Sequence, residues 1–111
     1  TVIPQIYYGF ENSAAPYQST LDEWDALAKQ GGIPLIAGLS VSKVGCEDTW
    51  AGSGKYEWIN YSDIISRQAA AAKKCASYGG IALYSYRSVF QPESSVSKQV
   101  KKEITALRDI L

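Results

Sequence analysis

The sequence predicts an α/β fold in which three strand–helix units follow one another along the chain. Three runs have the composition of strands: residues 3–10, 33–41 and 80–86. Each run is followed by a loop and then by apolar residues at helical spacing. Because consecutive βα units join parallel strands through crossover helices, we expect a parallel sheet covered by helices. The chain of 111 residues suffices for one domain with one core.

The first predicted strand alternates between two kinds of side chain. One face carries Gln5, Tyr7, Gly9 and Glu11, and the other carries Ile6, Tyr8 and Phe10. We expect the apolar face to pack under helices and the polar face to line a barrel interior or a cleft. Thr20 and Glu23 then form a predicted capping box at the start of a helix, which Gly31-Gly32 ends.

The second predicted strand is nearly all apolar or small, which is typical of a strand buried on both faces. Gly38 and Ser40 share a face with Ile36, so the side chains on that face become smaller toward the end of the strand. The following segment, residues 42–60, is long for a βα connection, and long ordered loops usually carry function. Its aromatic side chains favour order: Trp50, Tyr56 and Trp58. Asn60 or Ser62 is the predicted cap of the Ala-rich second helix.

The third predicted strand begins directly after Gly79-Gly80, which ends the second helix. Its exit loop contains Arg87 and Ser88. Ser94 or Ser95 is the predicted cap of the last helix. That helix has a clear apolar stripe, formed by Val96, Val100, Ile104, Leu107 and Leu111.

Charge and composition argue against several classes of function. Eleven basic and eleven acidic residues cancel, so we expect neither a nucleic-acid partner nor a polybasic membrane contact. No apolar run approaches the roughly 20 residues of a membrane-spanning helix. The chain contains no histidine, which excludes every Ser-His and Cys-His mechanism within it and argues against a metal site. We expect no cofactor. The two cysteines, Cys46 and Cys75, are either paired or free, because sequence does not give their separation.

Four motifs carry a family resemblance: Pro4-Gln5-Ile6-Tyr7-Tyr8-Gly9-Phe10-Glu11-Asn12, Leu21-Asp22-Glu23-Trp24, Leu35-Ile36-Ala37-Gly38-Leu39 and Gly80-Ile81-Ala82-Leu83-Tyr84-Ser85-Tyr86. They resemble the C-terminal part of a bacterial glycosyl hydrolase-like 10 family, whose members are (β/α)8 barrels. The resemblance spans nearly the whole chain and implies that its three units are strands six to eight of a TIM barrel. Ser42, before Lys43, departs from the family, which commonly has an aromatic residue there.

The resemblance implies that residues 1–111 are a single partial-barrel segment at the C-terminal end of a larger protein. Five βα units would then be missing. Either the missing N-terminal part of the barrel or a homo-oligomer would complete the sheet. The resemblance also implies a secreted or cell-envelope protein of a bacterium, with carbohydrate as its ligand.

Barrel active sites lie at the C-terminal ends of the strands, which places Glu11 on the active rim. Glu11 is therefore the candidate general acid of a glycoside hydrolase, or else a solvated residue that pairs with Lys43 or Arg87. Glycoside hydrolysis normally needs two carboxyl groups. In such barrels the second would be expected on an earlier strand, which this chain lacks. Glu47 and Asp48 lie in the long loop, where acidic residues next to Trp50 are typically surface groups.

Seven further side chains are candidates for binding substrate: Gln5, Tyr7, Lys43, Trp50, Trp58, Tyr86 and Arg87. The tryptophans could stack on sugar rings or form a local core that orders the long loop. Gln5 and the two tyrosines could hydrogen-bond sugar hydroxyls or pack as buried polar groups. The two cations could hold a carboxylate-bearing sugar or pair with Glu11.

Three functions are compatible with these residues. The first is the C-terminal part of a glycoside hydrolase acting on O-glycosyl bonds, incomplete and inactive alone. The second is carbohydrate binding without cleavage. The third is a (βα)3 unit that self-associates through its exposed sheet edges.

Overall fold

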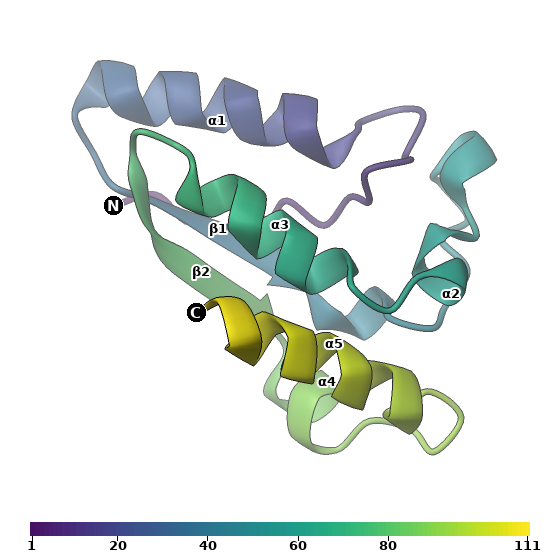
Figure 1. Ribbon diagram of the computed structural model, residues 1–111. Helices are drawn as coiled ribbons and strands as arrows, with labels where there is room; N and C mark the ends of the chain where they lie inside the picture. The colour runs from purple at the N-terminus through teal and green to yellow at the C-terminus, as the bar shows by residue number, and fades with distance from the viewer.

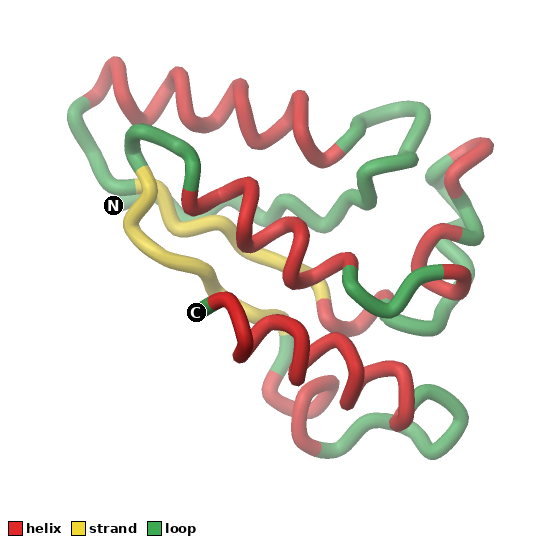
Figure 2. The backbone as a smooth tube through the Cα atoms, viewed as in Figure 1, coloured by secondary structure: helices red, strands yellow, loops and turns green.

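Two parallel strands form the sheet of the computed structural model, which describes residues 1–111 (Figures 1 and 2). They are β1 (Leu35–Ser40) and β2 (Tyr78–Tyr84). Five α-helices accompany them: α1 (Tyr17–Gly31), α2 (Glu57–Asn60), α3 (Ile64–Lys73), α4 (Tyr86–Phe90) and α5 (Ser97–Ile110). Helices α1 and α3 pack on β1, and α5 packs chiefly against α3 (Figure 1). The predicted α/β class with parallel strands is confirmed.

The first predicted strand is instead an extended segment that pairs with β1 only at isolated positions. Val2 is bridged to Leu35 and Gln5 to Gly38, both in parallel. Pro4 lies between them and has no N–H group, so it cannot continue a regular ladder. The hydrogen bonds that remain are Val2 N to Pro34 O, Ile36 N to Val2 O, Gly38 N to Pro4 O and Ile6 N to Gly38 O, all 2.9–3.0 Å. The segment therefore runs alongside β1 in the same direction.

Strand β1 is the centre of the fold, with the N-terminal segment on one side and β2 on the other. Its residues are buried on both faces except for Ile36, as the sequence predicts. Gly38 lets the N-terminal segment approach closely, because a Cβ atom there would lie 2.7 Å from the carbonyl oxygen of Pro4. Leu35, Ala37 and Leu39 face the helices and belong to the hydrophobic core.

Helix α1 begins at Tyr17, three residues before the predicted cap at Thr20. Pro16 starts it, and the Thr20 hydroxyl donates to the Pro16 carbonyl, 2.9 Å away, from within the first turn. The carbonyl of Gly9 accepts the Tyr17 N–H at 2.9 Å. A backbone partner distant in sequence thus replaces the predicted capping box. The helix ends as predicted, with Gly32 at φ 66°.

Helix α3 is capped by a side chain from another helix. Neither Asn60 nor Ser62 caps it, contrary to the prediction. The buried carboxylate of Glu103, in α5, accepts the N–H groups of Ile64 and Ile65 at 3.1 and 2.9 Å. An acidic group at a helix N-terminus accepts hydrogen bonds from free N–H groups and interacts favourably with the positive end of the helix dipole. This contact fixes α5 against α3. Helix α5 itself begins after Val96, not at a serine cap.

The two cysteines are free, and no helix has the length and apolar character needed to cross a bilayer. Burial is the main cause that raises the pKa of Cys75 to about 11, and the nearby carboxyl groups of Asp25 and Asp22 add to it.

We predict that Gly38→Ala lowers the free energy of unfolding by about 1–3 kcal/mol, since the added methyl group must displace the N-terminal segment. Gly31→Ala is the matched control, because a Cβ atom there meets only the Ile33 side chain at 3.8 Å or more. Urea unfolding of both variants measures the difference. Equal stabilities would contradict the close approach at Gly38.

Candidate functional site

The ends of the three parallel segments meet at one side of the sheet. We call this side the carboxyl edge: residues 7–11, 40–43 and 84–88. The pairing of the three segments brings their ends to this side, since Gln5 is bridged to Gly38 and Ser40 pairs with Tyr84. In open parallel sheets, ligands bind outside the carboxyl ends of the strands. The carboxyl edge is therefore the candidate functional site of this sheet.

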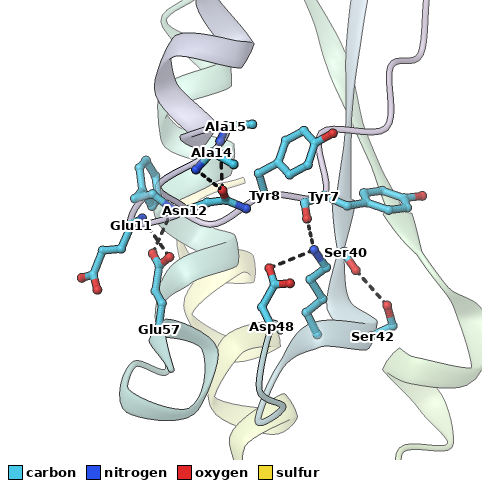
Figure 3. Close-up of polar contacts among 12 residues, drawn as sticks. Tyr7, Tyr8, Glu11, Asn12, Ala14, Ala15, Ser40, Ser42, Asp48 and Glu57 are labelled. Atoms are coloured by element: carbon cyan, nitrogen blue, oxygen red, sulfur yellow. Dashed lines mark hydrogen bonds and ion pairs between the residues drawn. The ribbon is translucent and has the colours of Figure 1, made fainter. Parts of the chain in front are cut away.

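Two tyrosine rings lie close together across the end of β1. The ring centroids of Tyr7 and Tyr84 are 5.6 Å apart at an interplanar angle of 32°. Ser40 lies in register with Tyr84, and its small side chain leaves room for the rings to approach. Its hydroxyl is 2.8 Å from the Ser42 hydroxyl (Figure 3). Burial, and then the neighbouring Tyr84, raise the pKa of Tyr7, so its hydroxyl stays protonated and can donate a hydrogen bond.

These side chains occupy the face of the sheet that the helices leave uncovered. The alternate residues Ile6 and Leu39 are in the core, so Gln5, Tyr7 and Ser40 point to the opposite side. Leu83 packs against the core, and Tyr84 is 53% exposed. We call the group of Gln5, Tyr7, Ser40 and Tyr84 the open face. Its accessible groups are the Tyr7 and Tyr84 side chains and the Gln5 amide, which carry no charge, while Ser40 itself is buried.

Lys43 connects the N-terminal segment to the long loop. Its ammonium group donates to the carbonyl oxygen of Tyr7 and to Asp48 Oδ2, 3.1 Å away (Figure 3). It also lies 5.8 Å from the centroid of the Tyr8 ring. Asp48 is only 8% exposed, so its interpretation as a surface group is wrong. The charge of Lys43 is balanced within the protein, and it pairs with Asp48 instead of Glu11.

Glu11 is held at the carboxyl edge through its backbone. The buried carboxylate of Glu57 accepts the N–H groups of Phe10 and Glu11, both at 2.9 Å. Gly9 is required beside it, because a Cβ atom there would overlap the Glu57 carboxylate. The side chain of Glu11 is exposed, forms no ion pair, and points away from Asp48 (Figure 3). Burial is the main cause that raises the pKa of Glu57.

A cavity of about 420 Å³ lies beyond the ends of β1 and β2, against the segment that leads from α4 into α5. The polar part of its lining includes Ser42, Cys46, Arg87, Ser88, Gln91 and Glu93. Arg87 lies in α4 and forms no ion pair, so it pairs neither with Glu11 nor with any other carboxyl group. The cavity therefore adds a free cation and several hydroxyl groups to the carboxyl edge.

The aromatic candidates of the sequence separate into buried and exposed residues. Trp58 is 1% exposed and belongs to the hydrophobic core, so no sugar ring can reach it, and it orders the long loop instead. Trp50 is 88% exposed on that loop. Tyr86 is exposed on α4, where its ring centroid lies 4.8 Å from that of Phe90. Only Tyr7 among the aromatic candidates lies on the open face.

The sequence pattern does not assign a role in this site to three residues that build it: Tyr84, Asp48 and Glu57. For Tyr84, the alternation of residues 80–86 is the signal that indicates the face it occupies. Asp48 is separated from Lys43 by four residues in the sequence, and nothing in that spacing indicates a buried pair. Glu57 precedes Trp58 at a helix start, and its partners are more than 40 residues away.

The chain matches no protein-family model, no curated protein and no solved structure. No group of three or more cysteine, aspartate or glutamate side chains is placed to hold a metal ion.

The raised pKa of Glu57 predicts a pH-dependent contribution to stability. The ordinary pKa of this carboxyl group is about 4.5, and its pKa in the folded protein is higher. Between these two values, Glu57 keeps its proton in the folded protein but has lost it in the unfolded protein. The free energy of unfolding should therefore fall as pH rises through this window and level off above it. Urea unfolding of the protein and of Glu57→Gln from pH 4 to 7 measures the difference, in which contributions common to both cancel. Parallel stability curves would contradict the prediction.

Proposed function

We propose that the open face binds carbohydrate at the carboxyl edge of the sheet. The observation that carries this proposal is the pair of adjacent, partly exposed tyrosine rings, Tyr7 and Tyr84. Flat aromatic faces pack against the C–H groups of sugar rings, and their hydroxyl groups hydrogen-bond sugar hydroxyls. The amide of Gln5 and the hydroxyl of Ser42 lie close enough to the same edge to extend this pattern.

The charge distribution favours a neutral sugar on this face. Lys43 is already paired with Asp48, so it places no unbalanced charge beside the tyrosines. Tyr7, Tyr84 and Gln5 are neutral groups that both donate and accept hydrogen bonds. Small-molecule sites combine apolar surface with a few polar groups that fix orientation, and the open face has both.

The proposal predicts that Tyr7→Ala and Tyr84→Ala each weaken sugar binding about tenfold or more, which corresponds to ~1.4 kcal/mol. Retention on columns of insoluble polysaccharides, followed by calorimetry with oligosaccharides of the retained polymer, measures the effect. Trp50→Ala is the matched control, because it removes an aromatic side chain that is more exposed than either tyrosine.

If Trp50→Ala weakens binding more than both tyrosine variants, the loop is the binding site and the open face is not. If the unaltered protein is retained on no polysaccharide, carbohydrate binding itself is contradicted. Circular dichroism of each variant verifies that its fold is intact.

Glycoside hydrolysis is a second candidate, favoured by the way Glu57 fixes the backbone of Glu11 and leaves the Glu11 carboxyl group free at the carboxyl edge. As the family resemblance implies, Glu11 would be the general acid of a partial TIM barrel. Hydrolysis needs a second carboxyl group on the other side of the bond. Asp48 does not supply it, since it is buried and paired with Lys43. The second group would therefore come from further barrel units or from another subunit.

For this second candidate, Glu11→Gln should abolish hydrolysis in the complete, active assembly while leaving sugar binding unchanged, because the amide keeps the size of the side chain but cannot donate the proton. Release of reducing sugar, measured alongside calorimetry, separates the two effects. Glu23→Gln, which alters an exposed carboxyl group on α1, is the control. Unchanged turnover by Glu11→Gln would exclude Glu11 as the acid.

A further inference from the structure

Strand β2 has a free edge. It pairs with β1 on one side, and no strand pairs with it on the other (Figure 2). A free edge presents unpaired backbone N–H and C=O groups, which are a template for a further strand. The packing contacts of α5 are chiefly with α3, so α5 does not replace the missing strand.

The free edge lacks two of the features with which proteins block such pairing, charged side chains and proline. Residues Tyr78–Tyr84 contain no charged residue and no proline. The only irregularity is a register shift between Leu35 and Ile36, which leaves Gly79 without a partner and affects only the start of the strand. The stretch from Gly80 to Tyr84 pairs regularly with β1. By contrast, Pro4 interrupts the N-terminal segment at the other side of the sheet.

We propose that two copies of this chain associate by antiparallel pairing of β2 with β2 about a twofold axis through Ala82. This register uses the whole regular stretch. It places Ala82 opposite itself, Ile81 opposite Leu83 of the partner subunit, and Gly80 opposite the partner's Tyr84. Each contact occurs twice, as an isologous interface requires.

Sequence and charge explain why a second copy fits this edge. Like charges directly opposite each other destabilise a strand pair, and this pairing brings none together. The chain has eleven basic and eleven acidic residues, so two copies carry no net charge that would separate them. The Tyr84 ring meets a glycine, where no side chain obstructs it.

The proposed dimer also extends a sheet that is small by itself. Its strand order would be β1-β2-β2-β1, with four strands in one continuous sheet. The carboxyl edges of the two copies would lie at opposite ends of this sheet, because the central pair is antiparallel.

Sedimentation velocity of the unaltered chain tests the proposal. At concentrations on the order of 100 µM, we expect a mass twice the 12.1 kDa of one chain. Ala82→Lys and Ala82→Asp should each sediment as monomers, because each places like charges directly opposite one another. An equimolar mixture of the two variants should restore the dimer through opposite charges. Ala26→Lys, a change of the same kind on the exposed face of α1, should remain dimeric.

Three results would overturn the proposal. In the first, the unaltered chain is a monomer. In the second, the Ala82→Lys variant still forms a dimer when it is measured by itself. In the third, the equimolar mixture stays monomeric although both variants give folded circular dichroism spectra. The first needs no variant, so the proposal does not depend on how well the substituted proteins fold.

Discussion

The pairing of β1 with a neighbour on each side is the constraint on which the rest of this structure depends. The N-terminal segment lies against β1 because Gly38 has no side chain in the way. β2 lies on the other side, in a register that sets Ser40 beside Tyr84. Because all three segments run in the same direction, their ends reach the same edge. The two tyrosine rings are neighbours only as a consequence of this double pairing.

Buried acidic side chains then fix the surrounding loops and helices. Glu57 binds the backbone at Phe10 and Glu11, and Glu103 binds the first N–H groups of α3. Hydrogen bonds to charged groups contribute about 1.5–3 kcal/mol each, and leaving a buried partner unsatisfied costs a similar amount. Together with the pair of Lys43 and Asp48, these contacts hold the carboxyl edge in place, although the edge consists mainly of chain ends and loops.

Much of the fold could be predicted from local patterns, because apolar runs and glycine pairs act over short distances. The buried nature of β1 and the end of α1 at Gly31-Gly32 are of this kind. The start of α1 could not be predicted from Thr20, since the partner of its first N–H group is the distant carbonyl of Gly9. The cap of α3 likewise comes from Glu103, 38 or 39 residues away in sequence. In the candidate site, the sequence predicts Tyr7 and Lys43 as functional candidates. It does not predict the partners that orient them, because these depend on the register of strands and loops.

The open face and the Glu11 side chain represent two different kinds of chemistry at one edge. The tyrosines present a neutral aromatic surface, and Glu11 presents a single free carboxyl group. We therefore propose recognition of a sugar in preference to its cleavage. Both depend on the same arrangement of three parallel segments.

The measurement that tests this arrangement most directly is a nuclear Overhauser spectrum of the aromatic protons in solution. With ring centroids 5.6 Å apart, Tyr7 and Tyr84 should give cross-peaks between their ring protons. These cross-peaks would establish that the N-terminal segment and β2 flank the end of β1. Their absence, in a spectrum that shows the Tyr86 and Phe90 contact at 4.8 Å, would contradict the double pairing of β1 and the open face built on it.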